Sequence, residues 1–428
     1  MRAEVEIIPA DRYNGHRNRK SACVQQRRAS SAGKTERCDE MNIVHIAPNA
    51  VFTDGWAYQE NLLLKYQMKL GHTVTLLTRN HAFVDGKETE VPCSDEICSG
   101  GFRVIRLKKK SPFGDRSINL FSFLDVYALL LELKPDMVFV HGMVSATIFQ
   151  VAKYKRKVNK NLVIVQDNHM DYNNIETKSS LTGRISALTY RAYYKMNDKY
   201  IDRVYGVTPR RREYAIKVYG VPEEKTDVLI MGADDEKIQF DRKAEIRSEI
   251  RKKYGISDDA FLIVTGGKID RVKNIHLLMK AIEPYESAHL LIFGMVLDDM
   301  REEFDALLAA NSRISYAGWI SGDQVYDYFF AGDLVCFPGL HSVLWEQACA
   351  AKVPCLFTYL EGMTHVNNGG NAAFLETVNL ENLQKMIGEL LFTQRYYEMK
   401  RAAESEKTDI YLYSGIAKKS LELLERRA

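Results

Sequence analysis

The sequence has no long uninterrupted hydrophobic run. No stretch of about 18 or more uncharged apolar residues, the length that suggests a membrane-spanning helix, occurs in the chain. The longest apolar stretch, residues 120–133, contains Asp125 and Glu132 and predicts an amphipathic helix. We therefore expect no transmembrane helix in this chain.

Cysteine is scarce and scattered. The seven cysteines among 428 residues form no CxxC pair, and Cys93 and Cys98 lie too far apart for that motif. Cys336, Cys349 and Cys355 lie within apolar runs, as small core residues do. We therefore expect reduced thiols in a cytoplasmic protein, and no zinc site.

The chain also lacks a strong charge of one sign. Its net charge is +3, and residues 1–40 alone carry nine Lys or Arg and six Asp or Glu, so the remainder is neutral. A neutral chain argues against a nucleic-acid partner. Two basic clusters remain, at residues 108–110 and 210–212. They are either solvated surface or contacts to anionic lipid or a phosphate-bearing acceptor.

Residues 1–40 have no apolar periodicity and are rich in Arg, Ser, Asn and Gln, which predicts a disordered extension. They contain no apolar segment of the kind that a secretory signal needs. A strand-like run follows Met41 at once. We expect Met41 to be the functional start and the first 40 residues to be an upstream extension.

From Met41 onward, short apolar runs alternate with helical patterns, which predicts an α/β architecture. The pattern restarts after a charged helix at residues 242–254. We predict two doubly wound, Rossmann-like domains, at 41–235 and 236–405, facing each other across a cleft. A C-terminal helical segment, 406–428, is expected to pack back on the first domain.

One candidate site lies between the apolar runs 334–337 and 353–357. Ser342 is predicted to cap a helix that runs to about Lys352. The turn before this helix would present backbone N–H groups that favour a phosphate. Glu346, one turn into the helix, could accept hydrogen bonds from sugar hydroxyls. The alternative is that Glu346 only complements the helix dipole.

A second candidate lies after the first strand of the second domain. Gly266 and Gly267 would let the backbone approach a diphosphate, and Lys268 and Lys273 would offer compact positive charges to its oxygens. The alternative is two solvated lysines near a turn.

A third candidate lies in the first domain. His169 follows the predicted strand 162–165 closely, and such positions lie at the ligand-facing edge of an open sheet. Gly55, in the loop after the first strand, fits a position where backbone approaches a ligand. The alternative for both residues is a structural role.

Taken in order, seven windows resemble the retaining GT-B glycosyltransferases that are family-4-like (glycosyltransferase group 1), of the bacterial surface-polysaccharide type. The resemblance runs over about residues 41–425. It rests on MNIVHIAP with DGWAYQENLL, KPDMVFVHG, QDNHMD, MGADDEKIQF, GGKIDRVKN and HSVLWEQACAAKVPC.

The resemblance implies that the second domain binds a nucleotide-diphosphate sugar. Lys268 and Lys273 match the family's basic pair at the leaving diphosphate, and His169 matches a histidine beside the transferred sugar. These three are the expected catalytic residues. The residues expected to bind the donor are Gly55, Gly267, Lys268, Lys273, Gly294, Trp319, His341, Ser342, Val343 and Glu346.

One departure from the family pattern concerns its E-x7-E motif. Glu346 matches the second glutamate, which binds the ribose hydroxyls, but Pro338 stands where the first should be. The loop is shorter than the family expects. We hypothesise that His341, or the N–H groups of Ser342 and Val343, takes over part of the first glutamate's task.

The expected activity is transfer of a sugar, with retention, to a glycan or lipid-linked acceptor in surface polysaccharide biosynthesis. No Asp-x-Asp cluster is present, so we expect no cofactor and no essential metal. The expected location is the cytoplasm, with peripheral contact at the inner face of the membrane as an option. The alternatives are a nucleotide-sugar epimerase, a phosphorylase or an inactive GT-B partner subunit.

Overall fold

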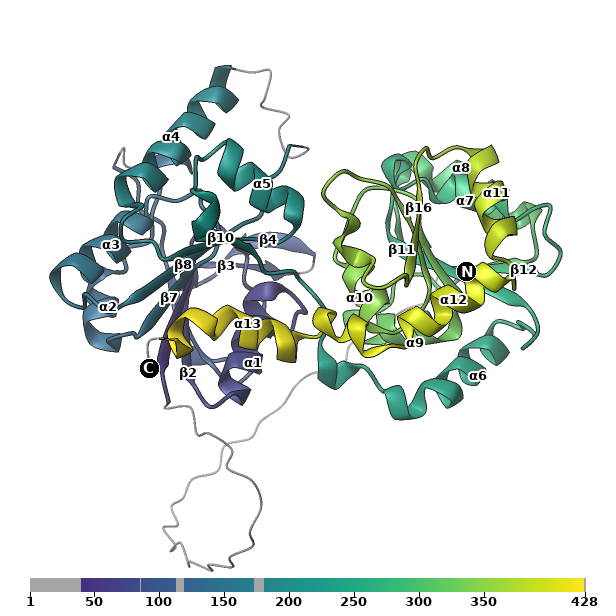
Figure 1. Cartoon of the computed structure of the whole chain (residues 1–428), viewed down its shortest axis with the longest axis horizontal. Helices are drawn as coiled ribbons and strands as arrows, with labels where there is room; N and C mark the ends of the chain where they lie inside the picture. The colour runs from purple at the N-terminus through teal and green to yellow at the C-terminus, as the bar shows by residue number, and fades with distance from the viewer. Residues whose placement is uncertain (1–39, 85, 113–118, 173–180, 427–428) are drawn as a thin grey trace, which may run out of the picture. The chain divides into compact units, whose positions relative to one another are not determined.

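The computed structural model describes residues 40–84, 86–112, 119–172 and 181–426, shown as coloured ribbons in Figure 1. The prediction of a disordered extension at residues 1–40 concerns residues that, apart from Glu40, lie outside the described ranges.

The N-terminal half folds around an eight-stranded sheet in the order β10-β9-β8-β7-β1-β2-β6-β5. Neighbouring strands are parallel except for β5, which runs antiparallel to β6. The strands are β1 Asn42–Ala47, β2 Thr73–Arg79, β5 Asp95–Ile97, β6 Arg103–Leu107, β7 Met137–Val140, β8 Val163–Asn168, β9 Arg203–Gly206 and β10 Thr226–Val228. The helices are α1 Gln59–Lys69, α2 Tyr127–Leu133, α3 Ile148–Lys157, α4 Leu181–Asn197 and α5 Pro209–Lys217.

The C-terminal half folds around a parallel six-stranded sheet in the order β13-β12-β11-β14-β15-β16. The strands are β11 Phe261–Ile269, β12 Ala288–Val296, β13 Ile314–Tyr316, β14 Leu334–Phe337, β15 Cys355–Thr358 and β16 Ala372–Leu375. The helices are α6 Lys243–Lys253, α7 Ile275–Ala281, α8 Asp298–Ala310, α9 Val325–Ala331, α10 Leu344–Ala350, α11 Leu380–Leu390, α12 Gln394–Ala403 and α13 Tyr413–Glu425.

Both sheets reverse their strand order at one point, as doubly wound folds do. In the first sheet the reversal lies between β1 and β7, and in the second it lies between β11 and β14. Loops leave the carboxyl ends of the two strands there in opposite directions and open a crevice that commonly holds a ligand. The candidate residues follow these four strands or their neighbours.

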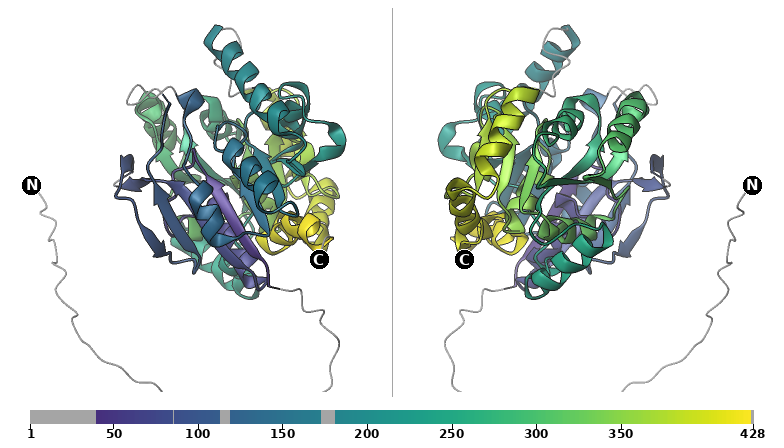
Figure 2. Two further views of the ribbon diagram at one scale, coloured as in Figure 1. Left: turned by 90° about the vertical axis from the view of Figure 1, so that its left-hand side faces the viewer. Right: turned by 90° about the vertical axis from the view of Figure 1, so that its right-hand side faces the viewer.

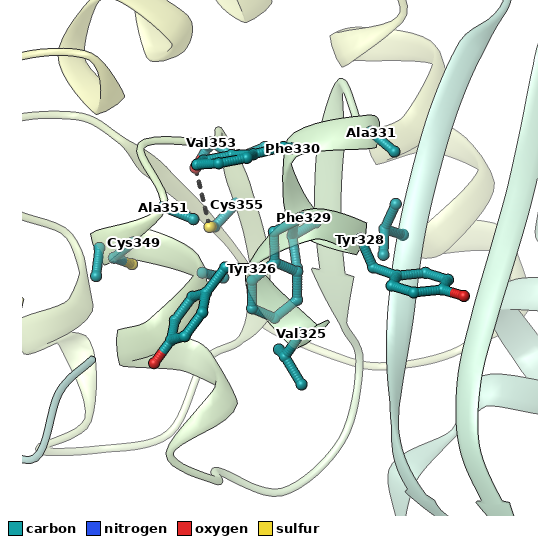
Figure 3. Close-up of a cluster of buried hydrophobic side chains, with 14 of the residues drawn as sticks. Val325, Tyr326, Tyr328, Phe329, Phe330, Ala331, Cys349, Ala351, Val353 and Cys355 are labelled. Carbon is teal, nitrogen blue, oxygen red and sulfur yellow. Dashed lines mark hydrogen bonds between the residues drawn. The ribbon is translucent and has the colours of Figure 1, made fainter. Parts of the chain in front are cut away.

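Each sheet has an apolar core on both faces. Along β11, Leu262 and Val264 belong to one core and Phe261 and Ile263 to the other, because successive side chains of a strand point to opposite faces. Figure 3 shows part of the first of these cores, where α9 packs near Cys355 and Cys349. The cysteines predicted to be core residues are indeed buried.

The C-terminal helix α13 packs against the N-terminal half of the protein. Ile416, Leu421 and Leu424 belong to the same apolar core as Leu62 and Leu63 of α1. Figure 1 shows α13 and α1 side by side. The chain therefore returns from the second sheet to close the core beneath the first.

One secondary-structure prediction was wrong. Residues 120–133 are helical only from Tyr127, after a short 3-10 turn at Asn119–Phe121. Val126 and Tyr127 donate their backbone N–H groups to the Gln150 side chain, which fixes the helix start there. Between β2 and β6, the chain also forms an antiparallel pair of short strands, β3, His81–Val84, and β4, Lys87–Glu90. In the C-terminal segment, a 3-10 helix at Glu406–Tyr411 precedes α13, which begins at Tyr413.

None of the helices in the described ranges has the length and apolar character that a membrane span needs. The longest, α4, exposes Ile185, Leu188 and Met196 to solvent. Figure 2 shows this helix projecting beyond its neighbours.

Candidate functional site

The loops that leave β11 and β14 pack tightly against each other. The Lys273 ammonium donates to the Leu340 carbonyl at 2.6 Å, and the Asn274 side-chain amide donates to the Pro338 carbonyl at 2.9 Å. A Cβ atom added to Gly339 would lie 2.3 Å from the Lys273 Cα, so only glycine fits there. Lys273 and the 338–343 loop, predicted to share one site, are therefore brought together at the reversal of the second sheet.

Lys268 lies within β11, because the strand continues through both glycines to Ile269. The prediction that the glycines follow the strand was wrong. Gly267 and Gly294 are paired across β11 and β12 with left-handed φ angles of +100° and +117°. A Cβ atom on Gly294 would lie 1.9 Å from the Gly267 carbonyl oxygen. Close packing of two strands is thus a sufficient reason for glycine at position 294.

The two lysines differ in their surroundings. Lys268 is exposed, and its ammonium lies 3.4 Å from the Asp270 carboxylate. Burial lowers the pKa of Lys273, an effect that the Asp270 charge only partly offsets. A group that is desolvated and held by a carbonyl is well placed to gain from a second, anionic partner.

Ser342 does not cap α10, contrary to the prediction. The helix starts at Leu344, and Val343 occupies the N-cap position without a side-chain hydrogen bond. Val343 already has helical backbone angles, and Ser342 contributes its carbonyl, which accepts from the Trp345 N–H at 3.0 Å. The helix ends at Ala350, before Lys352, which adopts a left-handed φ of +56°.

Glu346 is completely buried and contacts two histidines. The Nε2 atoms of His341 and His365 each lie 2.8 Å from the same carboxylate oxygen, Oε1. Burial alone would raise the pKa of Glu346, but the two imidazoles outweigh it and lower the pKa to about 2. Oε2, also buried, has no hydrogen-bond partner in the described part of the chain. Glu346, which was expected to bind the ribose hydroxyls, is therefore enclosed by protein side chains in this structure.

The same three side chains have the composition of a metal site. Their ligand atoms all lie within 4.8 Å of one another. Two imidazoles and a carboxylate suit zinc and several other divalent ions. Two N–H donors to Oε1 account for the same geometry without an ion, since each imidazole carries one proton.

At the reversal of the first sheet, His141 and His169 line a cavity of about 170 Å³ together with residues from the loop after β1 and with Glu60. His169 Nε2 lies 3.3 Å from the Oδ2 atom of Asp167, at the end of β8. Burial alone would lower the pKa of His169, but the Asp167 carboxylate outweighs it and the pKa is raised. The predicted histidine is therefore at the expected edge of the sheet.

Gly55 lies in the loop after β1 with a left-handed φ of +77°. It lines a second cavity, of about 200 Å³, with Asp54, Lys65 and Asp234 among its other walls. The Asp54 carboxylate accepts hydrogen bonds from the Ser99 hydroxyl at 2.6 Å and from the Ser99 backbone N–H at 2.9 Å, which fixes this loop. Gly55 therefore lies in a cavity separate from the one that His169 lines.

Trp319 follows β13, and 75% of its surface is exposed. The neighbouring Gly318 carbonyl accepts a hydrogen bond from the Gly294 N–H at 2.7 Å. Gly294 and the segment that contains Trp319, both expected to bind the donor, therefore lie side by side at the ends of β12 and β13.

Most of the basic clusters are engaged by the protein itself. Lys109 donates to Asn49 at 2.9 Å and Lys110 to Asp125 at 2.6 Å. Arg210 donates to the Glu361 carbonyl at 2.9 Å, and Arg212 to the Thr226 hydroxyl at 2.8 Å. These contacts favour the structural interpretation over that of lipid contact.

Four residues of these sites were not predicted as functional. His45, His141 and Asp167 come together only because β1, β7 and β8 are neighbours in the sheet. His365, from a 3-10 turn at Thr364–Val366, reaches Glu346 from 19 residues away along the chain. The sequence carries no periodic signal for these contacts. The one hint is that His141 and Asp167 stand at strand ends or beside them.

Two family models match this chain in succession. Residues 61–237 match Glycosyltransferase Family 4, and residues 246–407 match Glycosyl transferases group 1. The uncharacterized glycosyltransferase MJ1607 of Methanocaldococcus jannaschii is 21% identical over 51% of this chain and 58% of its own length. TuaC of Bacillus subtilis, provisionally a teichuronic acid biosynthesis glycosyltransferase, is 32% identical over 29% of this chain and 32% of its own. The chain therefore spans about a third to three fifths of these relatives.

Among solved structures, HepE of Anabaena in complex with UDP has a TM-score of 0.66 with 14% identity. The match covers 90% of this chain and 100% of HepE. At 14% identity, the structural likeness to HepE shows the fold alone. The chain thus has the GT-B fold, carries a family 4 domain followed by a group 1 domain, and belongs to the glycosyltransferases.

Proposed function

We propose that this protein transfers a sugar from a nucleotide-diphosphate sugar to a glycan or lipid-linked acceptor, with retention of configuration, in surface polysaccharide biosynthesis. The observation that carries the proposal is the contact of Lys273 with the 338–343 loop at the reversal of the second sheet. The UDP complex of HepE supports a nucleotide-sugar donor, and the provisional role of TuaC supports a polysaccharide product.

The proposed chemistry follows from where charge develops. Breaking the sugar–phosphate bond leaves negative charge on the diphosphate, which Lys268 and Lys273 would stabilise. Lys273 would exchange its carbonyl partner, Leu340, for a phosphate oxygen, a stronger charge-assisted bond. His169 would lie beside the sugar at the edge of the first domain, and Gly55, Gly294 and Trp319 would contribute to the donor site.

The acceptor would bind the N-terminal domain from the cytoplasmic side. The exposed apolar residues Ile185 and Leu188 on α4 would be the peripheral membrane contact. No cofactor or essential metal takes part in the proposed reaction.

The experiment is release of nucleoside diphosphate from a panel of sugar nucleotides, with and without a mixture of glycan acceptors. We expect Lys273→Ala to lower the rate by a factor of about 100 to 1,000, as loss of one charge-stabilising group does in other enzymes. Lys280→Ala, on α7, removes the same charge from an ion pair with Glu303 of α8 and is expected to leave the rate unchanged. Equal rates for the two variants would contradict the proposal.

The roles of His341 and of retention need separate measurements. If His341 replaces part of the missing glutamate, His341→Ala should raise KM for the donor or lower kcat, and an unchanged rate would refute that role. The anomeric configuration of the product, read by proton NMR, decides between retention and inversion.

A further inference from the structure

A chain of buried hydrogen bonds runs behind His169, from the C-terminal helix into the first sheet. The Gln67 amide lies 2.9 Å from the Ser420 Oγ atom of α13 and 2.7 Å from the His45 Nε2 atom. His45 Nδ1 lies 2.9 Å from His141 Nε2, and His141 Nδ1 lies 3.0 Å from Asp167 Oδ2. All five side chains are buried.

The direction of the first bonds follows from Ser420. Its hydroxyl proton goes to the Ala417 carbonyl at 2.6 Å, so its oxygen can only accept from Gln67. The Gln67 NH₂ group therefore faces Ser420, and its Oε1 atom faces His45. Because Oε1 only accepts, His45 must carry a proton on Nε2.

The far end of the chain is also an acceptor. The Asp167 carboxylate accepts from the Gly142 N–H at 2.6 Å and faces both His141 and His169. Burial alone would raise the pKa of Asp167, but the two imidazoles lower it well below its usual range, so the group is ionised. His141 must therefore carry a proton on Nδ1.

Three hydrogen bonds now join two rings to two acceptors. They need three protons, whereas two neutral imidazoles carry only two between them. One ring is consequently an imidazolium. His141 is the ring that contacts the ionised Asp167 carboxylate, and burial lowers the pKa of His45 well below its usual value, so His141 is the charged ring.

We propose that Gln67, His45, His141 and Asp167 form a positioning array in which a buried His141 imidazolium holds Asp167 as a carboxylate against His169. Four elements contribute: α1, β1, the end of β7 and β8. Helix α13 fixes the direction of the whole array through Ser420. The array thereby sets the orientation and protonation of His169 from behind, without touching a substrate.

The charged groups that face His169 are Asp167 on β8, Glu60 on α1, Arg211 on α5, and His141 at the end of β7. The Oδ2 atom of Asp167 lies 3.3 Å from the Nε2 atom of His169. Glu60 raises the pKa of His169 and Arg211 lowers it, both by smaller amounts than Asp167. Removal of the Asp167 charge should therefore dominate any change in His169.

The first test is nuclear magnetic resonance of the full chain labelled with ring-¹⁵N histidine. At pH 8 we expect one ring, identified by its loss in His141→Gln, to carry protons on both nitrogens, and His45 to be the neutral Nε2–H tautomer. A neutral His141 at that pH would overturn the proposal.

Ser420→Ala provides a variant that keeps all the ionisable groups. Without the hydroxyl, the Gln67 amide is free to turn and donate to His45. Two neutral rings can then make all three hydrogen bonds of the array. At pH 8 we expect the ring that carries two protons in the wild type to carry a single proton in Ser420→Ala. A ring that keeps both protons in this variant would overturn the role assigned to α13.

The second test rests on the proposed function and measures the pH dependence of donor turnover. Asp167→Asn should shift the alkaline limb to lower pH, because His169 loses the charge that raises its pKa. Asp125→Asn removes the same charge from an exposed ion pair with Lys110 and should leave the profile in place. Absence of any turnover would contradict the proposed function and leave the resonance result to decide the array.

Discussion

Glu346 is an ionised carboxylate that the protein shields completely from water. Its charge is compensated by His341 and His365, both at 2.8 Å from one oxygen. A charge buried in this way is stabilising only while it stays ionised and paired. The residue is therefore a structural centre of the second domain's ligand edge, whatever else it binds.

The acid stability of the protein should depend on this carboxylate. The pKa of Glu346 is lowered to about 2 from an ordinary value of 4.5, so its stabilisation is complete above pH 4.5. It is lost as the pH falls toward 2. Between about pH 5 and pH 3, the unfolding free energy of the wild type should fall more steeply than that of Glu346→Gln, measured by urea unfolding. Glu302→Gln, an exposed residue on α8, should keep the steeper wild-type slope.

Glycine at position 294 can be required either by the packing of β11 against β12 or by the approach of a ligand, and stability measurements test the first reason. A Cβ atom on Gly294 would lie 1.9 Å from the Gly267 carbonyl oxygen, whereas one on Gly255 would meet nothing within 4 Å. Both glycines have left-handed φ angles. We expect Gly255→Ala to cost about 1 kcal/mol of unfolding free energy and Gly294→Ala several times more. Equal losses in urea unfolding would show that the close approach of β11 and β12 is not what requires glycine at position 294.

At the scale of elements, α13 is the piece that joins the end of the chain to the first domain. Leu421 is fully buried in the core that α1 also lines. Truncating such a leucine to alanine costs about 2 to 5 kcal/mol, because it removes apolar contacts and leaves a cavity. The same helix supplies Ser420 to the histidine chain.

We accordingly expect Leu421→Ala to lower the unfolding free energy by about 2 to 5 kcal/mol. Lys418→Ala, on the exposed side of the same helix, should change it by less than about 0.5 kcal/mol. The measurement is a denaturant titration of each full-length variant. A Leu421→Ala variant as stable as Lys418→Ala would mean that α13 does not complete the core beneath the first sheet.

For the whole molecule, the question of a metal is open to a direct test. His341, Glu346 and His365 could hold a divalent ion, but the two N–H donors to Oε1 explain their arrangement without one. We expect donor turnover to persist in excess chelator, and elemental analysis of the purified protein to find less than one zinc per chain. If chelator abolished the activity, if zinc restored it, and if zinc failed to restore it in His365→Ala, the three residues would be a metal site.

The sequence by itself determined the alternation of strands and helices, the two doubly wound domains and the candidate loops at strand ends. These follow from local periodicity and from residue types, which act over a few residues. The family resemblance assigned Lys273 and the 338–343 loop to one donor site, and the structure brings them into contact.

Only the tertiary structure decided which partners each candidate has. Ser342 contributes its carbonyl, and not a side-chain cap, to the start of α10. Glu346 is enclosed because His365 reaches it from a turn 19 residues away along the chain. The buried chain from Ser420 to Asp167 joins residues 253 positions apart, through strands that are neighbours only in the sheet. Contacts of this kind depend on the packing of whole elements, and no local pattern in the chain encodes them.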